Sequence, residues 1–310
     1  ESADDLGTDN NQVHDQSNFN ISLSETTDGG TTISTSFEIV DEGTVAADDD
    51  NAIKLTFTDG SALELLNAGN AAGTHAAAVP GASGEQGIAG TSSNNAPTGI
   101  DFAAGSTALG VEWHSAADFM ADGLKVSASF STDNGAAKAA KARQENSWGV
   151  GATYVTTAGD STVTISGGVA DGEIATNGTQ ASSDKGGFNV GVVAVTGDLT
   201  IGLGYGDGDS FDYETANIEI DGSVTKAGIK YVTGDLTMAL GVTNGESKDG
   251  AFGTAGTTDD AVDSASASIT YAVASGVSAV IGYTTVDAQN DGTSITDSGS
   301  AWYVGATMSF

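Results

Sequence analysis

The stretch that decides the fold is residues 264–284, SASASITYAVASGVSAVIGYT, in which apolar residues occupy alternate positions. In its first half these alternate residues are Ala265, Ala267, Ile269, Tyr271 and Val273. Side chains of a β-strand point alternately to opposite faces, so a period of two predicts one apolar face and one small polar face. Ser275 and Gly276 interrupt the pattern with a turn signal. The stretch therefore predicts an antiparallel hairpin.

The same pattern of two short strands and a tight turn recurs along the whole chain. The sequence VTGDLT occurs at 195–200 and again at 232–237, and each copy is followed by a strand pattern and then by a long polar segment. No stretch shows a sustained period of 3.6, so the fold is predicted to be all-β. We expect fifteen strands, near 17–25, 31–39, 52–58, 61–66, 106–114, 123–131, 146–156, 161–170, 186–196, 198–206, 223–232, 235–244, 264–274, 276–286 and 300–310.

The composition excludes several classes of protein. The 310 residues include 9 Lys and Arg against 42 Asp and Glu, a formal net charge of −33, so binding to nucleic acid is not expected. The chain has no cysteine, which excludes disulfides and thiolate chemistry. The sequence contains no run of 18 apolar residues, so no transmembrane helix is predicted. His14, His75 and His114 are too scattered along the sequence to indicate a catalytic triad, so we do not expect an enzyme.

The small size of the polar residues predicts which way each strand faces. Serine, threonine, glycine and alanine fill the polar positions, whereas a water-exposed sandwich face would carry long charged side chains. Apolar side chains facing lipid and small residues facing a water-filled lumen are typical of a transmembrane antiparallel β-barrel. Aromatic residues are expected in two girdles, one at each membrane interface. The girdle at the long loops comprises Trp148, Phe188, Tyr205, Tyr283 and Trp302. The girdle at the short turns comprises Trp113, Tyr154, Tyr231, Tyr271 and Phe310.

The strand count has the wrong parity for such a barrel. Bacterial single-chain barrels normally have an even number of strands, so we expect sixteen strands with the first one missing upstream. Residues 1–16 would then form an external loop or its remnant. The alternative is that the weak strand at 61–66 is miscounted.

Three segments resemble a known family. They are TTDGG at 26–30 leading into ISTSFE at 33–38, AIKLTFTDGSALELL at 52–66, and SAWYVGATMSF at 300–310. The chain resembles the alphaproteobacterial general diffusion porins of Gram-negative bacteria. The resemblance implies a homotrimer in the bacterial outer membrane, short periplasmic turns and long external loops. It also implies that the third external loop, residues 67–105, folds into the pore and narrows it.

The resemblance further suggests which charged residues line the pore. The family usually sets acidic residues on the third loop against an arginine cluster on the wall. Here that loop carries only Glu85 and Asp101, and Arg143 is the one arginine in the sequence. The alternation places further charged side chains on the inner face, with His114 nearby, and they could create a transverse field or be solvated lumen charges without a special role. They are Lys54, Lys125, Lys226, Lys230, Glu38, Glu64 and Glu112.

The long loops concentrate the remaining acidic residues. The clusters that could bind Ca²⁺, or bridge to lipopolysaccharide through divalent cations, include Asp48, Asp49, Asp50, Asp207 and Asp209. The alternative is a solvated acidic surface, and no cofactor is required.

The expected function is a passive outer-membrane channel for small hydrophilic solutes and ions, formed by one domain spanning 1–310. Its negative field predicts a weak preference for cations. Two alternatives remain open at this point. A secreted acidic β-rich surface or adhesin protein would be soluble without detergent, and a substrate-specific outer-membrane channel would show saturable block by one solute.

Overall fold

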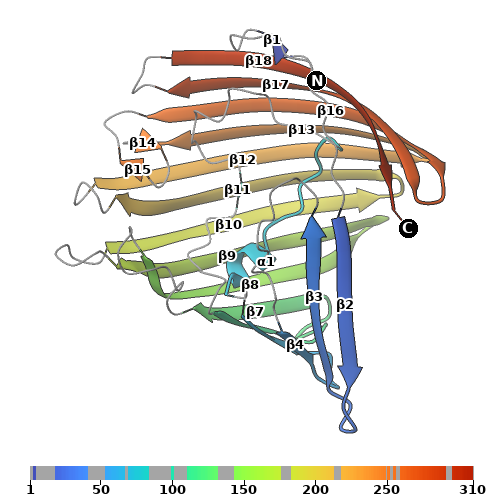
Figure 1. The fold of residues 1–310 in the computed structure, drawn as a ribbon, viewed down its shortest axis with the longest axis vertical. Helices are drawn as coiled ribbons and strands as arrows, with labels where there is room; N and C mark the ends of the chain where they lie inside the picture. The colour runs from blue at the N-terminus through green and yellow to red at the C-terminus, as the bar shows by residue number, and fades with distance from the viewer. Residues whose placement is uncertain are drawn as a thin grey trace.

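The computed structural model places most of the chain in one curved β-sheet (Figure 1). The residues that the structure describes are 3–4, 18–40, 53–66, 69–83, 99–100, 110–131, 143–175, 183–212, 218–248, 250–251, 254–255, 259–290 and 295–309. No helix within these ranges is both long enough and apolar enough to cross a membrane.

Within these ranges the sheet holds sixteen antiparallel strands. In sheet order they are β1 (Ala3–Asp4), β18 (Ile295–Met308), β17 (Val277–Asn290), β16 (Asp260–Ala274), β13 (Leu236–Ser247), β12 (Ile218–Thr233), β11 (Leu199–Asp212), β10 (Ser183–Thr196), β9 (Ser161–Ala175), β8 (Arg143–Ala158), β7 (Leu124–Ser131), β6 (Gly110–His114), β5 (Ala62–Leu65), β4 (Ile53–Thr56), β3 (Thr32–Val40) and β2 (Asn18–Thr26). β14 (Gly250–Ala251) and β15 (Thr254–Ala255) form a separate ribbon, and α1 (Ala71–Thr74) is a single helical turn.

The two faces of the sheet differ as the alternation predicts. Met238, Ile269, Ile281 and Val304 lie directly opposite one another on four adjacent strands. All four are exposed, with Val304 at 83 %. Their alternate neighbour Ser268 is 5 % exposed. Large apolar side chains that remain uncovered on one face of a sheet, in register from strand to strand, are typical of a surface in contact with lipid.

Glycines with positive φ close the short turns of the repeated unit. Gly197 and Gly234 occupy the same place in the two VTGDLT copies and have φ angles of 54° and 57°. A residue with a Cβ is disfavoured in this left-handed region, whereas glycine adopts it readily. The repeat therefore specifies the same tight turn twice, at the ends of β10 and β12.

The structure corrects one expectation about the strands and confirms another. Residues 1–16 are not simply an external segment, because Ala3 pairs with Ala301 and Asp4 with Ser300. A two-residue strand is too short to show alternation in the sequence. The weak strand at 61–66 is a true strand, β5, which pairs with β4 and β6.

The strands also extend further toward the long loops than expected. β11 continues to Asp212, well past the expected end near residue 206, and β12 begins at Ile218. In these extensions the outward positions carry carboxylates in place of apolar residues. We call this set the acidic collar: Asp171, Glu173, Asp207, Asp209, Asp221, Glu246, Asp263 and Asp287.

Candidate functional site

The third long loop lies against one face of the sheet. Residues 69–83, which make up most of its described part, are called the pore loop below, and the sheet face that they contact is called the inner face. The helical turn α1 packs against β7, β8, β9 and β10, and Figure 1 shows it in front of β8 and β9. Ala71 is completely buried there. The loop that resembles a constriction loop thus lies on the face opposite to the exposed apolar side chains of Met238, Ile269, Ile281, Val304 and their neighbours, which we call the apolar band.

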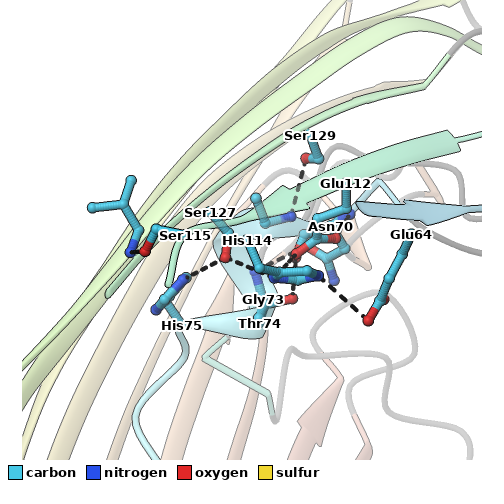
Figure 2. A network of polar contacts seen from close by, with 12 residues as sticks. Glu64, Asn70, Gly73, Thr74, His75, Glu112, His114, Ser115, Ser127 and Ser129 are labelled. Carbon is cyan, nitrogen blue, oxygen red and sulfur yellow. Dashed lines mark hydrogen bonds and ion pairs between the residues drawn. The ribbon is translucent and has the colours of Figure 1, made fainter. Parts of the chain in front are cut away.

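Glu112 fastens the start of the pore loop to the wall. Its side chain is almost completely buried on β6. One carboxylate oxygen, Oε2, accepts hydrogen bonds from the Asn70 amide at 3.0 Å and the Gly69 amide at 3.3 Å. The other, Oε1, accepts from Thr74 Oγ1 at 2.7 Å. A buried carboxylate requires such donors, and Figure 2 shows Asn70 and Thr74 beside Glu112.

His75 connects the loop to the neighbouring strands through hydroxyl groups. Its Nε2 lies 2.9 Å from Ser127 Oγ, and its Nδ1 lies 2.7 Å from Thr153 Oγ1. Ser127 Oγ also lies 2.9 Å from Nδ1 of His114 on β6. His75 and His114 therefore share one serine, although they lie far apart in the sequence.

The chain of contacts continues from His114 to two charged residues on β4 and β5. Nε2 of His114 lies 3.5 Å from Glu64 Oε1, and Lys54 Nζ donates to the same oxygen at 2.6 Å. Lys54 and Glu64 are direct register partners, and so are Glu64 and Glu112. The inner face of β4 to β7 therefore carries a continuous polar network at the base of the pore loop. Figure 2 shows its members on β5, β6 and β7.

Burial lowers the pKa of His75 below its usual value. The carboxylate of Glu112 acts in the opposite direction, whereas His114 and Lys125 lower the pKa further. Because protonation would place a cation in a poorly solvated position, His75 is neutral in the docked loop at neutral pH.

The far end of the pore loop is fastened to strands on the other side of the sheet. The Ser83 amide donates to Ser268 Oγ on β16 at 2.7 Å, and Tyr303 Oη on β18 donates to the Ser83 carbonyl at 2.9 Å. Between the two ends, Asn189 Nδ2 on β10 donates to the Ala72 carbonyl at 3.0 Å. The pore loop thus spans the inner face from β6 to β18.

The register places the candidate charged residues of the wall as follows. Lys54, Glu64, Glu112 and Lys125 share the inner face with the network above. Lys226 and Lys230 are the alternate neighbours of Gly228, which faces the loop at Pro80. Glu38 lies in β3 opposite Asn20. Glu85, Asp101 and Asp48–Asp50 lie outside the described residues.

The aromatic candidates lie on the outer face. Most are exposed, including Trp148, Tyr154, Tyr205, Tyr231, Tyr271 and Trp302. Trp113 and Tyr283 are half-buried because each packs against another ring, Trp113 on Phe119 and Tyr283 on Trp302. Phe310 lies outside the described residues.

The calcium hypothesis assumed that Asp207 and Asp209 lie in a loop, but the structure places them in a strand. Both lie within β11, where Asp207 accepts from Tyr205 Oη at 2.8 Å and Asp209 accepts from the Gly186 amide at 2.5 Å. The segment GDGD at 206–209 suggests a loop because its period of two alternates glycine with aspartate and has no apolar members. Within the described ranges, no group of three or more acidic or histidine side chains is placed to hold a metal ion.

Sequence reasoning missed most of the residues that hold the loop. Ser127, Ser268, Asn189 and Tyr303 come from four strands, and each bonds to the network or the pore loop. One signal was available, since His75 is a lone ionisable residue in a stretch of alanine and glycine.

Comparison with known proteins assigns the family. The family described as Gram-negative porin matches residues 1–309. The chain belongs to the Gram-negative porin family. This porin therefore forms a channel in the bacterial outer membrane, and its sheet is the wall of a transmembrane β-barrel. No curated protein is similar enough to the chain to count as a match.

Solved structures show the same fold at low sequence identity. A porin refined at 1.8 Å resolution is 18 % identical, with a TM-score of 0.58 over 98 % of this chain and 97 % of that one. An anion-selective porin from Comamonas acidovorans is 12 % identical, with a TM-score of 0.63 over 94 % of this chain and 89 % of that one. OmpT, an outer membrane protein of Vibrio cholerae, is 15 % identical, with a TM-score of 0.58 over 94 % of this chain and 95 % of that one.

Proposed function

We propose that this porin is a general diffusion channel for small hydrophilic solutes and ions. The observation that carries the proposal is the difference in polarity between the two faces of the sheet. Exposed apolar side chains cover the outer face, whereas the pore loop lies on an inner face of serine, threonine, glycine and histidine. A polar lumen narrowed by a loop admits solutes by size.

We further propose that the channel prefers cations weakly. The net charge of −33 favours cations at the mouths of the pore. The acidic collar lies on the outer surface beyond the apolar band, at the ends of the strands near the long loops. The inner face holds both signs, including Lys125, Lys226, Lys230 and the ion pair of Lys54 with Glu64. These lysines oppose the field of the carboxylates, which is why we expect the preference to be weak.

The same proposal assigns roles to the remaining candidates. The wall residues Lys54 and Glu64 line the pore, whereas Glu112 is covered by the pore loop and holds that loop to the wall. The exposed rings lie at the two membrane interfaces. Because the chain belongs to the Gram-negative porin family, we propose that it forms a homotrimer surrounded by lipopolysaccharide. A trimer that resists detergent until heated, observed by gel electrophoresis, would support this assembly.

The test is electrical recording of the detergent-purified porin in planar lipid bilayers. Under a KCl gradient we expect a reversal potential on the cation side. A second assay measures the swelling of liposomes that contain the porin in sugars of increasing size. We expect the rate of swelling to fall smoothly as the sugar becomes larger. Heat-denatured protein serves as the control. A reversal potential on the chloride side would overturn the cation preference. Saturable block by one solute would overturn general diffusion and indicate a substrate-specific channel.

A further inference from the structure

The wall beneath the pore loop is built of glycine on six consecutive strands. On β8 to β13 the inner-face residues under the loop are Gly151, Gly168, Gly191, Gly202, Gly228 and Gly241. We call these six residues the glycine belt. Several are direct register partners, since Gly151 lies opposite Gly168, and Gly228 lies opposite both Gly202 and Gly241. The belt therefore runs across the strands rather than along one of them.

At every belt residue except Gly241 the loop approaches more closely than an added Cβ would permit. A Cβ on Gly228 would overlap the carbonyl oxygen of Pro80, and a Cβ on Gly191 would overlap the Ala77 side chain. A Cβ on Gly168 would lie 2.5 Å from the Ala72 Cα. Because atoms of the loop backbone are involved, rotation of a side chain cannot relieve these overlaps.

A second observation shows that the loop is held to this wall rather than merely near it. Its two ends are hydrogen-bonded to Glu112 and to Ser268 and Tyr303, and Asn189 holds Ala72 between them. Asn189 is 3 % exposed and lies opposite Gly168 in the register. The fastened ends determine where the loop crosses the wall, and the glycines determine how closely it approaches.

We propose that the glycine belt sets the aperture of this porin. Its members act as positioning residues, because each missing side chain lets the loop lie closer to the wall and leaves more of the lumen open. The proposal rests on the proposed diffusion function. It predicts that a methyl group added to the belt pushes the loop into the lumen and narrows the path for ions.

The test compares alanine variants within the belt and outside it. Gly228→Ala and Gly191→Ala introduce a Cβ beneath the loop. Gly305→Ala is the matched control, because this glycine is also on the inner face of a strand and its added Cβ would meet only Val280 Cγ1, at 3.7 Å. If glycine served only the curvature of the strands, the control would behave like the belt variants.

Two independent measurements are made on each variant. Unitary conductance in planar bilayers reports the aperture, and hydrogen exchange of the peptide containing Ser83 reports docking of the loop. We expect lower conductance in both belt variants, together with about tenfold faster exchange, the effect of weakening roughly one hydrogen bond. Gly305→Ala should match the parent in both measurements.

The remaining outcomes decide against the proposal. Belt variants that keep the parent's conductance, with or without faster exchange, would show that the belt does not set the aperture. Equal effects in Gly305→Ala would show that the belt glycines serve the curvature of the strands and do not set the aperture. If the parent does not conduct, the diffusion function fails, while exchange still shows whether the belt holds the loop. Should Gly228→Ala not fold, Gly241→Ala offers a milder change, because its Cβ would lie 3.1 Å from the Gly81 Cα.

Discussion

Glu112 is the residue on which attachment of the pore loop most depends. Its carboxylate accepts three hydrogen bonds from the loop and is buried on β6. Glu112→Gln keeps the shape of the side chain but replaces one acceptor oxygen with an amide donor. We expect docking of the loop to weaken by about 1–3 kcal/mol, the cost of leaving buried donors unpaired. Hydrogen exchange at Gly69 and Asn70 measures this loss.

A matched control for Glu112→Gln is Glu64→Gln, since Glu64 lies on the same face and contacts His114 and Lys54 but not the loop backbone. Slowed or unchanged exchange at Gly69 and Asn70 in Glu112→Gln would contradict the role assigned to Glu112.

Two adjacent residues of β9 test the direction of the sheet faces. Ile165 is 47 % exposed on the outer face, opposite Tyr154 and Val192, whereas Thr164 points to the inner face. Ile165→Lys should destabilise the barrel by about 2–4 kcal/mol, because a lysine near the bilayer midplane is placed in hydrocarbon. Thr164→Lys adds the same charge at the same depth to a water-filled lumen and should cost far less. Urea unfolding of both variants in lipid vesicles gives the comparison, and equal destabilisation would refute the assigned orientation.

At the scale of elements, the pore loop should respond to pH through His75. Burial lowers its pKa, so the docked loop binds this proton less readily than the undocked loop does. Docking is therefore at full strength above the ordinary histidine pKa of about 6.5 and weakens as pH falls below it. Among the described residues, the charged groups around His75 are Glu112, His114 and Lys125. Thr153 and Asn189 on the adjacent strands are neutral.

The measurement is hydrogen exchange of the pore loop between pH 7.5 and pH 5, corrected for the intrinsic pH dependence of exchange. His75→Gln retains polar contacts but cannot titrate, so its corrected exchange should not vary over this range. A parent loop with the same flat profile would show that protonation of His75 does not affect docking.

The sequence predicts the elements of the wall far better than the contacts of the loop. Alternation identifies β16 and β17 because every second residue is apolar and the other face is small and polar. It misses the C-terminal part of β11 because Asp207 and Asp209 alternate with glycine, and a polar stretch of this kind is also typical of a loop. The contact between His75 and Ser127 leaves no periodic trace, since it depends on how the loop lies in three dimensions.

At the scale of the whole molecule, the cation preference should fade with added salt. Exposed carboxylates act over a Debye length of about 10 Å at 0.1 M and about 3 Å at 1 M. We expect a clear cation-side reversal potential at a mean of 0.1 M KCl and a nearly unselective channel at 1 M. Asp221→Asn with Asp287→Asn removes two collar charges and should reduce the preference at low salt.

Asp59→Asn is the control for this pair, because it removes one charge from the opposite rim, in the short turn between β4 and β5. A preference that is the same at both salt concentrations would locate its origin inside the lumen instead of on the collar.

The pairing of Ala3 with Ala301 joins the first strand of the chain to the last one. Every other neighbour in the sheet follows its partner in sequence, apart from the small ribbon of β14 and β15. This contact can therefore form only after every strand between them in the sequence has been synthesised. Until then the apolar band has no lipid to cover it, so cellular chaperones must keep the nascent polypeptide from aggregating during its transit to the membrane.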